Sequence, residues 1–198
     1  MPRLNLLPQR LPAALSDRLG RAIARTGLTP NMLSCIGLAG NVAAAVLVAQ
    51  EALLWAAAVF LVFSVVDLFD GAVARATGRA TPFGAVLDAV FDRISEGVLL
   101  AGVAVYFADR GENVQVGVTF AALLGSVSVS YLRARAEAEG LSMREGLFRR
   151  QERVALLTVG LLFDALTLVA WPLAVLTHLT VLQRFFMLAR QRPESAAP

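Results

Sequence analysis

The sequence predicts an all-α, polytopic integral membrane protein: six transmembrane helices preceded by an interfacial amphipathic helix. Three observations predict this fold. The chain is 57% hydrophobic with a mean hydropathy of +0.65, which is too apolar for an ordinary soluble domain. Several apolar runs reach the roughly 20 residues that a helix needs to cross a bilayer. These runs are rich in Ala and Leu and lack the alternation that is typical of an outer-membrane barrel.

The chain divides into three segments. Residues 1–30 form a juxtamembrane, cytoplasmic amphipathic segment, residues 31–191 a six-helix domain, and residues 192–198 a tail. Within the first segment, residues 10–26 repeat Leu or Ile every four positions, and arginines occupy most of the remaining surface. This pattern favours a helix that lies in the headgroup layer, with packing on the protein itself as the alternative.

Hydropathy predicts the six spans, with ends uncertain by a few residues, at about 32–50, 53–75, 83–107, 114–133, 153–170 and 172–190. Polar segments separate most of the spans, and Trp171-Pro172 is expected to mark the tight turn between the last two. The arginines set the orientation, because only Arg110 falls in a presumed external turn. The sequence therefore predicts an inner (plasma) membrane protein whose two termini and two larger polar loops face the cytoplasm.

Four carboxylates interrupt this apolar pattern. Asp67 and Asp70 lie three residues apart near the end of the second span, and Asp88 and Asp92 lie four apart near the start of the third. Each spacing places two side chains on one face of a helix. A short loop makes the two helices antiparallel, so Asp70 and Asp88 are expected at one depth and the other two about one turn deeper. All four should meet just inside the cytoplasmic boundary.

Divalent cations would explain why these carboxylates are tolerated. Each ionised carboxylate in hydrocarbon costs about 2.5–3.5 kcal/mol, and the segment has too few cations to pair them all. Oxygen ligands favour Mg²⁺ or Mn²⁺, and four carboxylates can hold two ions. Gly71 and Gly84 leave room beside the cluster for a bulky ligand. The alternative is a set of paired carboxylates at the rim of the membrane.

The same segment resembles the signature of a known family. It reads Asp67-x-x-Asp70-Gly71-x-x-Ala74-Arg75, then eight residues, then Gly84-x-x-x-Asp88-x-x-x-Asp92. Every fixed position of the CDP-alcohol phosphotransferase signature is present at the right spacing. The resemblance implies a membrane enzyme that moves a substituted phosphate from a CDP-linked donor to an alcohol and releases CMP. It also implies a homodimer.

The resemblance assigns roles to individual residues. The carboxylates of Asp67, Asp70, Asp88 and Asp92 would bind two Mg²⁺ or Mn²⁺ ions, and Asp92 would also take the proton of the acceptor hydroxyl. Residues of the signature and of the similar element "TPNMLS" would bind the CDP-lipid: Pro30, Asn31, Ser34, Gly71, Arg75, Thr81 and Gly84. Ser34 stands where the family usually has Thr, and it keeps the hydroxyl.

The acceptor alcohol depends on a different region. The stretches "SYLRARAEAEGL" and "RRQERV" are similar to the matching region of actinobacterial phosphatidylinositol-phosphate synthases, which implies inositol 1-phosphate as the acceptor. Guanidinium groups suit a dianionic phosphate, and the candidates are Arg133, Arg153, Arg150 and Arg190. The alternative is that these arginines are positive-inside anchors. Glycerol 3-phosphate or another alcohol is the alternative acceptor, and CDP-diacylglycerol is the expected donor.

A divalent-cation transporter is a distant alternative for the carboxylates. Transporters commonly place ion sites at the bilayer midplane, between structural repeats. Here the carboxylates are expected near one interface, and the sequence shows no internal repeat. These two features favour the enzyme.

Overall fold

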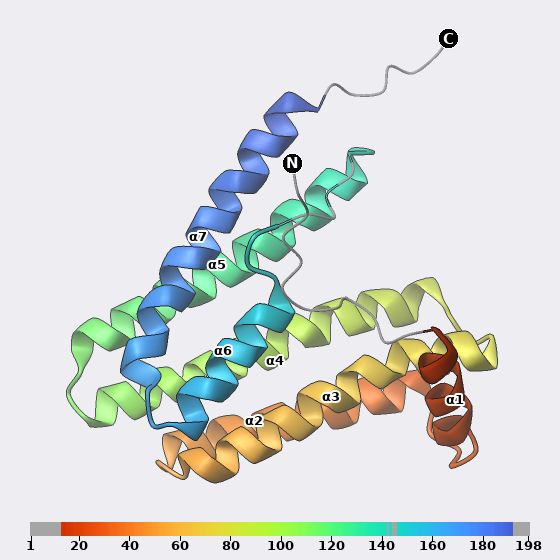
Figure 1. Ribbon diagram of the computed structural model, residues 1–198, viewed down its shortest axis with the longest axis horizontal. Helices are drawn as coiled ribbons and strands as arrows, with labels where there is room; N and C mark the ends of the chain where they lie inside the picture. Colours follow the sequence, from red (N-terminus) through yellow and green to blue (C-terminus); the bar gives the residue numbers. More distant parts are fainter. Residues whose placement is uncertain (1–12, 142, 144–145, 192–198) are drawn as a thin grey trace.

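The structure is a computed structural model that describes residues 13–141, 143 and 146–191, and this part of the chain is all α-helical. Figure 1 shows the seven helices. They are α1 (Ala13–Ala24), α2 (Pro30–Ala49), α3 (Leu53–Thr77), α4 (Pro82–Asp109), α5 (Asn113–Ala138), α6 (Arg150–Leu162) and α7 (Leu166–Arg190). The predicted tail at 192–198 lies outside the described residues, as do residues 1–12 of the N-terminal segment.

The six longer segments form three consecutive hairpins, α2–α3, α4–α5 and α6–α7. Helix α2 packs on α3 and α4, α5 packs on α7, and α6 contacts α3 and α7. Figure 1 shows α2, α3 and α4 running together, while α5 and α7 form a second group inclined to the first. Helix α1 packs on α3, with Gly20 against the backbone of Ala72.

Local sequence signals explain where the helices around the α3–α4 turn begin and end. Thr29 and Thr81 cap α2 and α4, and each is followed by a proline in the first helical turn. Proline suits that position because its missing N–H would have no intrahelical partner there. Gly78 ends α3 in the left-handed conformation, with a φ of 65°, which glycine adopts without steric cost. The turn between α3 and α4 is therefore short.

Among the described helices, α2, α3, α5 and α7 are long and apolar enough to cross a membrane. Helix α4 has 28 residues, but it carries four charged residues, Asp88, Asp92, Arg93 and Glu96, which all lie between its seventh and fifteenth residues. Helix α6 has only 13 residues. The structure therefore supports four spans by length and composition, and the count of six stays a prediction.

The predicted turn at Trp171-Pro172 is wrong. The chain turns at residues 163–165 instead, where Asp164 has a φ of 49°, and Pro172 lies inside α7. A proline within a helix removes one backbone hydrogen bond, but it does not end the helix when the neighbouring residues are well packed. Here Ala170 and Leu173 are both buried, and the helix continues through the proline.

The apolar core and a polar contact cluster occupy the end of the molecule that holds the three hairpin turns. Phe107 and Leu161 are fully buried in this core. Tyr106 donates a hydrogen bond of 3.1 Å to Asp164, and Arg110 pairs with Glu51 at 3.0 Å. Arg110 also lies 3.9 Å from the centre of the Tyr106 ring. These contacts join the α2–α3 and α6–α7 turns to the end of α4.

Candidate active site

The carboxylates of α3 and α4 meet at the opposite end from the hairpin turns. Asp70 and Asp88 lie close enough for their side chains to interact electrostatically. Asp67 and Asp92, about one turn deeper, both contact Arg150 at the start of α6. Its Nη2 lies 2.9 Å from Asp67 Oδ2, and its Nη1 lies 2.9 Å from Asp92 Oδ1. The structure thus brings the four carboxylates together as two pairs at successive depths.

A cation already lies within this cluster, because the guanidinium of Arg150 stands between Asp67 and Asp92. Within the described residues, no group of three Asp, Glu, His or Cys side chains is arranged to hold a metal ion. The donors themselves are hard carboxylate oxygens from two adjacent helices, which is the chemistry that Mg²⁺ and Mn²⁺ prefer. The residues fit a divalent-metal site in which Arg150 and the metal would compete for the same oxygens.

Small groups on α2 and α3 hold two of the carboxylates in place. Ser34, buried in α2, donates a hydrogen bond of 2.8 Å to Asp70 Oδ2, and the backbone N–H of Gly71 donates to Asp70 Oδ1. Gly37 makes room for Asp67, because a Cβ at that position would overlap Asp67 Oδ1. Helix α2 therefore positions carboxylates that belong to α3.

The residues predicted to bind the nucleotide gather around the same end. Thr81 accepts a hydrogen bond of 3.0 Å from the N–H of Gly84. A Cβ added to Gly84 would lie 3.4 Å from Asn31 Oδ1, so the beginnings of α2 and α4 are close to each other. Pro30 opens α2, and Arg75 lies exposed near the end of α3. Two helix N-termini facing one volume favour an anion there, because their N–H groups carry partial positive charge.

The four arginines predicted for the acceptor phosphate lie in different surroundings. Arg150 contacts the carboxylates. Arg153 is only 2% exposed and forms two contacts with Glu96, at 2.5 and 2.8 Å. Arg133 is exposed and pairs with Glu137 at 2.9 Å, and Arg190 is exposed at the end of α7. Of the four, Arg150 and Arg153 have contacts on α4.

Arg184 is a buried arginine that the sequence analysis did not single out. It is 4% exposed, and its Nη1 donates a hydrogen bond of 2.5 Å to the carbonyl of Val129. The charges of Arg133, Arg153 and Arg149 act on it. Its position inside the last apolar run was the available signal, since a charged residue within a membrane span is a functional candidate.

Comparison with known proteins identifies the family. Residues 27–189 match the CDP-alcohol phosphatidyltransferase family. The chain belongs to this family. As a CDP-alcohol phosphatidyltransferase it is an enzyme, and the matched residues include α3 and α4.

Two relatives illustrate the breadth of this likeness. The phosphatidylinositol phosphate synthase of Mycobacteroides abscessus is 37% identical over 189 residues, which cover 91% of this chain and 86% of the relative. The archaetidylinositol phosphate synthase of Pyrococcus horikoshii is 35% identical over 171 residues, covering 86% of this chain and 88% of the relative.

Solved structures of a Mycobacterium tuberculosis phosphatidylinositol phosphate synthase share the fold. The structure with CDP-DAG bound gives a TM-score of 0.82 at 32% identity and covers 93% of this chain and 98% of that one. The complex with manganese and citrate gives a TM-score of 0.81 at 34% identity and covers 92% of each chain.

Proposed function

We propose that this CDP-alcohol phosphatidyltransferase transfers a phosphatidyl group from CDP-diacylglycerol to inositol 1-phosphate, giving phosphatidylinositol phosphate and CMP. The observation that carries the proposal is the joint carboxylate cluster of α3 and α4, surrounded by the nucleotide-binding candidates of the family signature. Both relatives described above make inositol phosphate lipids, and the M. tuberculosis enzyme was solved with CDP-DAG.

We assign the divalent-metal site to Asp67, Asp70, Asp88 and Asp92, with two Mg²⁺ or Mn²⁺ ions. Ions held there would neutralise the charge of the diphosphate that an incoming oxygen must approach. The manganese complex of the M. tuberculosis enzyme supports a divalent metal. Ser34 and Gly37 keep Asp70 and Asp67 in position for this task.

The transfer step needs a base, because an alcohol is a weak nucleophile at neutral pH. The acceptor oxygen forms a bond to the phosphorus of the phosphatidyl group, while the bond from that phosphorus to the bridging oxygen of CMP breaks. Asp92 takes the hydroxyl proton, and CMP leaves with the bonding electron pair as a phosphate monoester. At 24% side-chain exposure, Asp92 is the more accessible of the two carboxylates that contact Arg150.

The donor would bind at the end of the molecule that carries the α3–α4 turn. The beginnings of α2 and α4 direct backbone N–H groups toward this region, and Arg75 adds a positive charge at the end of α3. We place Pro30, Asn31, Ser34, Gly71, Arg75, Thr81 and Gly84 around the CDP group. The acyl chains of the donor would then stay in the hydrocarbon throughout the reaction.

The acceptor phosphate would bind among the arginines that lie between α5, α6 and α7. Arg150 reaches the carboxylates, and Arg184 lies where the charges of Arg133 and Arg153 also act. Arg190 is a more distant candidate at the end of α7. A binding role for Arg153 stays a prediction, since its guanidinium is held by Glu96.

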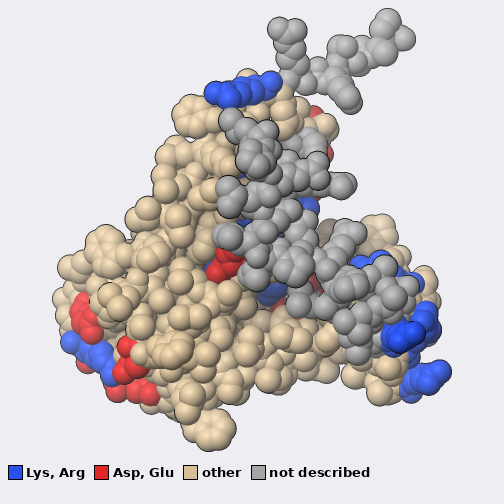
Figure 2. Space-filling model, viewed as in Figure 1, with Lys and Arg blue, Asp and Glu red and all other residues tan. Residues whose placement is uncertain are grey.

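We further propose six membrane-spanning segments, with α1 at the interface, and an active site that faces the cytoplasm of the inner (plasma) membrane. Figure 2 shows basic side chains gathered over the end of the molecule that carries α1. Arg18, Arg21 and Arg25 lie in this region, whereas Arg110 is at the opposite end and is paired with Glu51. This asymmetry suits the rule that arginines remain on the cytoplasmic side, where both termini would also lie. A homodimer is expected from the family.

An acceptor panel tests the reaction. The purified protein receives CDP-diacylglycerol with inositol 1-phosphate, glycerol 3-phosphate or inositol, and CMP release is followed. We expect CMP with inositol 1-phosphate. Release with glycerol 3-phosphate alone would identify a phosphatidylglycerophosphate synthase and would contradict the acceptor assignment. CMP release with none of the three would contradict the proposed function.

A further inference from the structure

We infer that the buried ion pair of Glu96 and Arg153 is a positioning device that sets α6 against α4, so that Arg150 faces Asp67 and Asp92. Neither Glu96 nor Arg153 contacts a carboxylate of the cluster in the described structure. Their role is to hold Arg150, which contacts Asp67 and Asp92, in position. The inference rests on the proposed function only in the assignment of the carboxylates and Arg150 to the active site.

Two arginine–acid contacts join the same pair of helices, one turn apart. Arg150 of α6 contacts Asp92 of α4, and Arg153, three residues later, contacts Glu96, four residues later. Because these spacings are those of residues on one helical face, the two ion pairs lie one above the other between α4 and α6, one helical turn apart. The geometry of the Glu96–Arg153 ion pair therefore constrains that of the Arg150–Asp92 ion pair.

Of the two ion pairs, the one between Glu96 and Arg153 is held in position by more contacts. The side chain of Arg153 is 3% exposed, whereas that of Arg150 is 25% exposed. The fork of Arg153 donates from Nε to Glu96 Oε1 at 2.5 Å and from Nη2 to Oε2 at 2.8 Å. Its Nη1 also reaches back to the carbonyl of Phe148, just before α6, at 3.4 Å. Such a bidentate contact fixes both distance and orientation.

The start of α6 needs this support, because Arg150 is its first residue. The first turn of a helix lacks half of its intrahelical hydrogen bonds and is held by other contacts. Here the N–H of Arg149 donates to Glu152 at 3.0 Å, and the N–H of Phe148 donates to Thr180 of α7 at 3.1 Å. Those contacts tie the segment to itself and to α7. The ion pair of Arg153 with Glu96 links this segment to α4.

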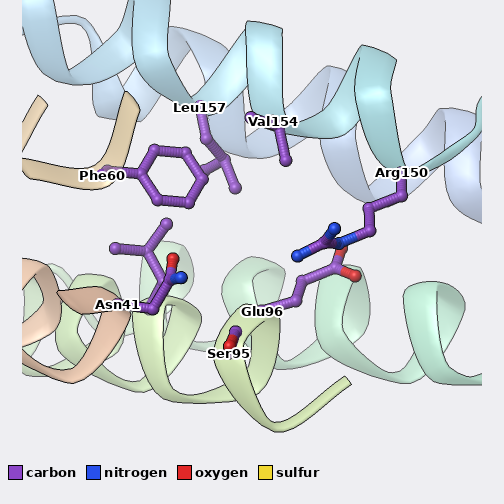
Figure 3. Close-up of a pocket in the computed structure, with 8 residues that line it drawn as sticks. Asn41, Phe60, Ser95, Glu96, Arg150, Val154 and Leu157 are labelled. Carbon is purple, nitrogen blue, oxygen red and sulfur yellow. The ribbon is translucent and has the colours of Figure 1, made fainter. Parts of the chain in front are cut away.

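A small cavity lies between α2, α3, α4 and α6. It has a volume of about 10 Å³, room for one water molecule, and lies beside Ser95, Glu96 and Arg150. In Figure 3, Arg150 extends from α6 toward Glu96 of α4 at one side of this cavity. Helix α6 packs on α3 and α7, and long side chains reach from α6 to α4 at this level. The Glu96–Arg153 ion pair is therefore placed to set how far apart α4 and α6 lie.

Replacing both Glu96 and Arg153 by apolar residues separates an effect on the position of Arg150 from an effect on the stability of the protein. In Glu96→Leu/Arg153→Met both charges are removed together, which leaves no unpaired buried charge, so the protein is expected to fold with an unchanged or higher Tm. The KM for inositol 1-phosphate should rise roughly 10- to 100-fold, as when support of a site residue is lost, while the KM for CDP-diacylglycerol stays unchanged. Adding Glu96→Leu/Arg153→Met to Arg150→Gln should not raise the KM for inositol 1-phosphate any further, because both changes act through Arg150. Wild-type kinetics in the apolar pair would overturn the inference.

A distance measurement tests the same point without activity. Spin labels on Val90→Cys of α4 and Val159→Cys of α6, in a Cys35→Ser background, report the separation of the two helices at exposed positions. The distance distribution should shift or broaden in the apolar pair, and an unchanged distribution would contradict the inference. If the wild type accepts none of the alcohols, the proposed function fails, and this measurement still decides the positioning role.

Glu51→Gln is the matched control, since it removes an ion pair with Arg110 at the other end of α4. It should leave both KM values and the spin-label distances unchanged. If the apolar pair does not fold, Glu96→Asp carries the test, because it keeps the charge on a side chain one methylene shorter. Glu96→Asp is expected to raise the KM for inositol 1-phosphate, and a wild-type KM together with an unchanged label distance would overturn the inference.

Discussion

Asp67 of α3 and Asp92 of α4 are held by one guanidinium, with each carboxylate 2.9 Å from a different nitrogen of Arg150. Because Arg150 belongs to a third helix, its charge reaches the carboxylates only after α6 has packed beside α3 and α4. The cluster is therefore a product of three helices, and variants of each should have separable effects.

Asp92→Asn should lower CMP release about 10²- to 10⁴-fold, because the amide cannot accept the acceptor proton. The Tm should fall only slightly, since the side chain keeps its size and Arg150 keeps its ion pair with Asp67. Asp109→Asn, at the exposed far end of the same helix, is the control and should behave as the wild type. Normal turnover in Asp92→Asn would rule out its role as base.

Ser34→Ala should reduce CMP release roughly 10-fold, because Asp70 loses the hydrogen bond of 2.8 Å that orients it. Ser34→Thr retains the hydroxyl and should keep most of the activity. The control is Thr119→Ala, whose buried hydroxyl donates only to Gln115 in its own helix. Equal activity in Ser34→Ala and the wild type would show that this hydrogen bond has no part in catalysis.

Gly37→Ala should impair both stability and activity, because the added methyl group would overlap the carboxylate of Asp67. Overpacking of this kind costs about 1–3 kcal/mol, and a displaced site residue can lower turnover about 100-fold. Thermal unfolding and CMP release measure the two effects. Gly117→Ala, where no atom lies within 4 Å of the added Cβ, should leave both unchanged. Similar results for the two variants would contradict the tight packing between α2 and Asp67.

Exhaustive chelation should abolish CMP release, and added Mg²⁺ or Mn²⁺ should restore it. The reason is electrostatic: without a cation the carboxylates would repel the diphosphate of the donor. The Asp67→Asn/Asp88→Asn variant provides a comparison, since added metal should not restore its activity. Full turnover after chelation would remove the basis of the metal assignment.

Tyr106→Phe should lower the Tm by a few degrees without changing either KM. It removes the hydrogen bond to Asp164, worth about 0.5–1.5 kcal/mol, at the end of the molecule remote from the carboxylates. Tyr131→Phe, at an exposed position, is the control and should not shift the Tm. A change in KM for Tyr106→Phe would show that the two ends are coupled.

Hydropathy and spacing predicted much of the fold and the carboxylate cluster. The runs of apolar residues predicted the helices, since main-chain polar groups in lipid must be paired within a segment. The spacing of Asp70 and Asp88 from the α3–α4 turn predicted their equal depth, and the closeness of the two side chains agrees with it. Pro172 misled the analysis because proline marks a local preference, and packing of its neighbours overrides that preference.

The sequence by itself determined the helices, the α3–α4 hairpin and the two depths of its four carboxylates, because periodicity and loop length are local properties of the chain. Only the tertiary structure decided which arginine meets those carboxylates. Arg150 and Arg153 are three residues apart on α6, and the sequence offers each as a phosphate ligand. The placement of α6 beside α4 directs Arg150 to Asp92 and Arg153 to Glu96, and that placement depends on contacts between helices distant in the chain.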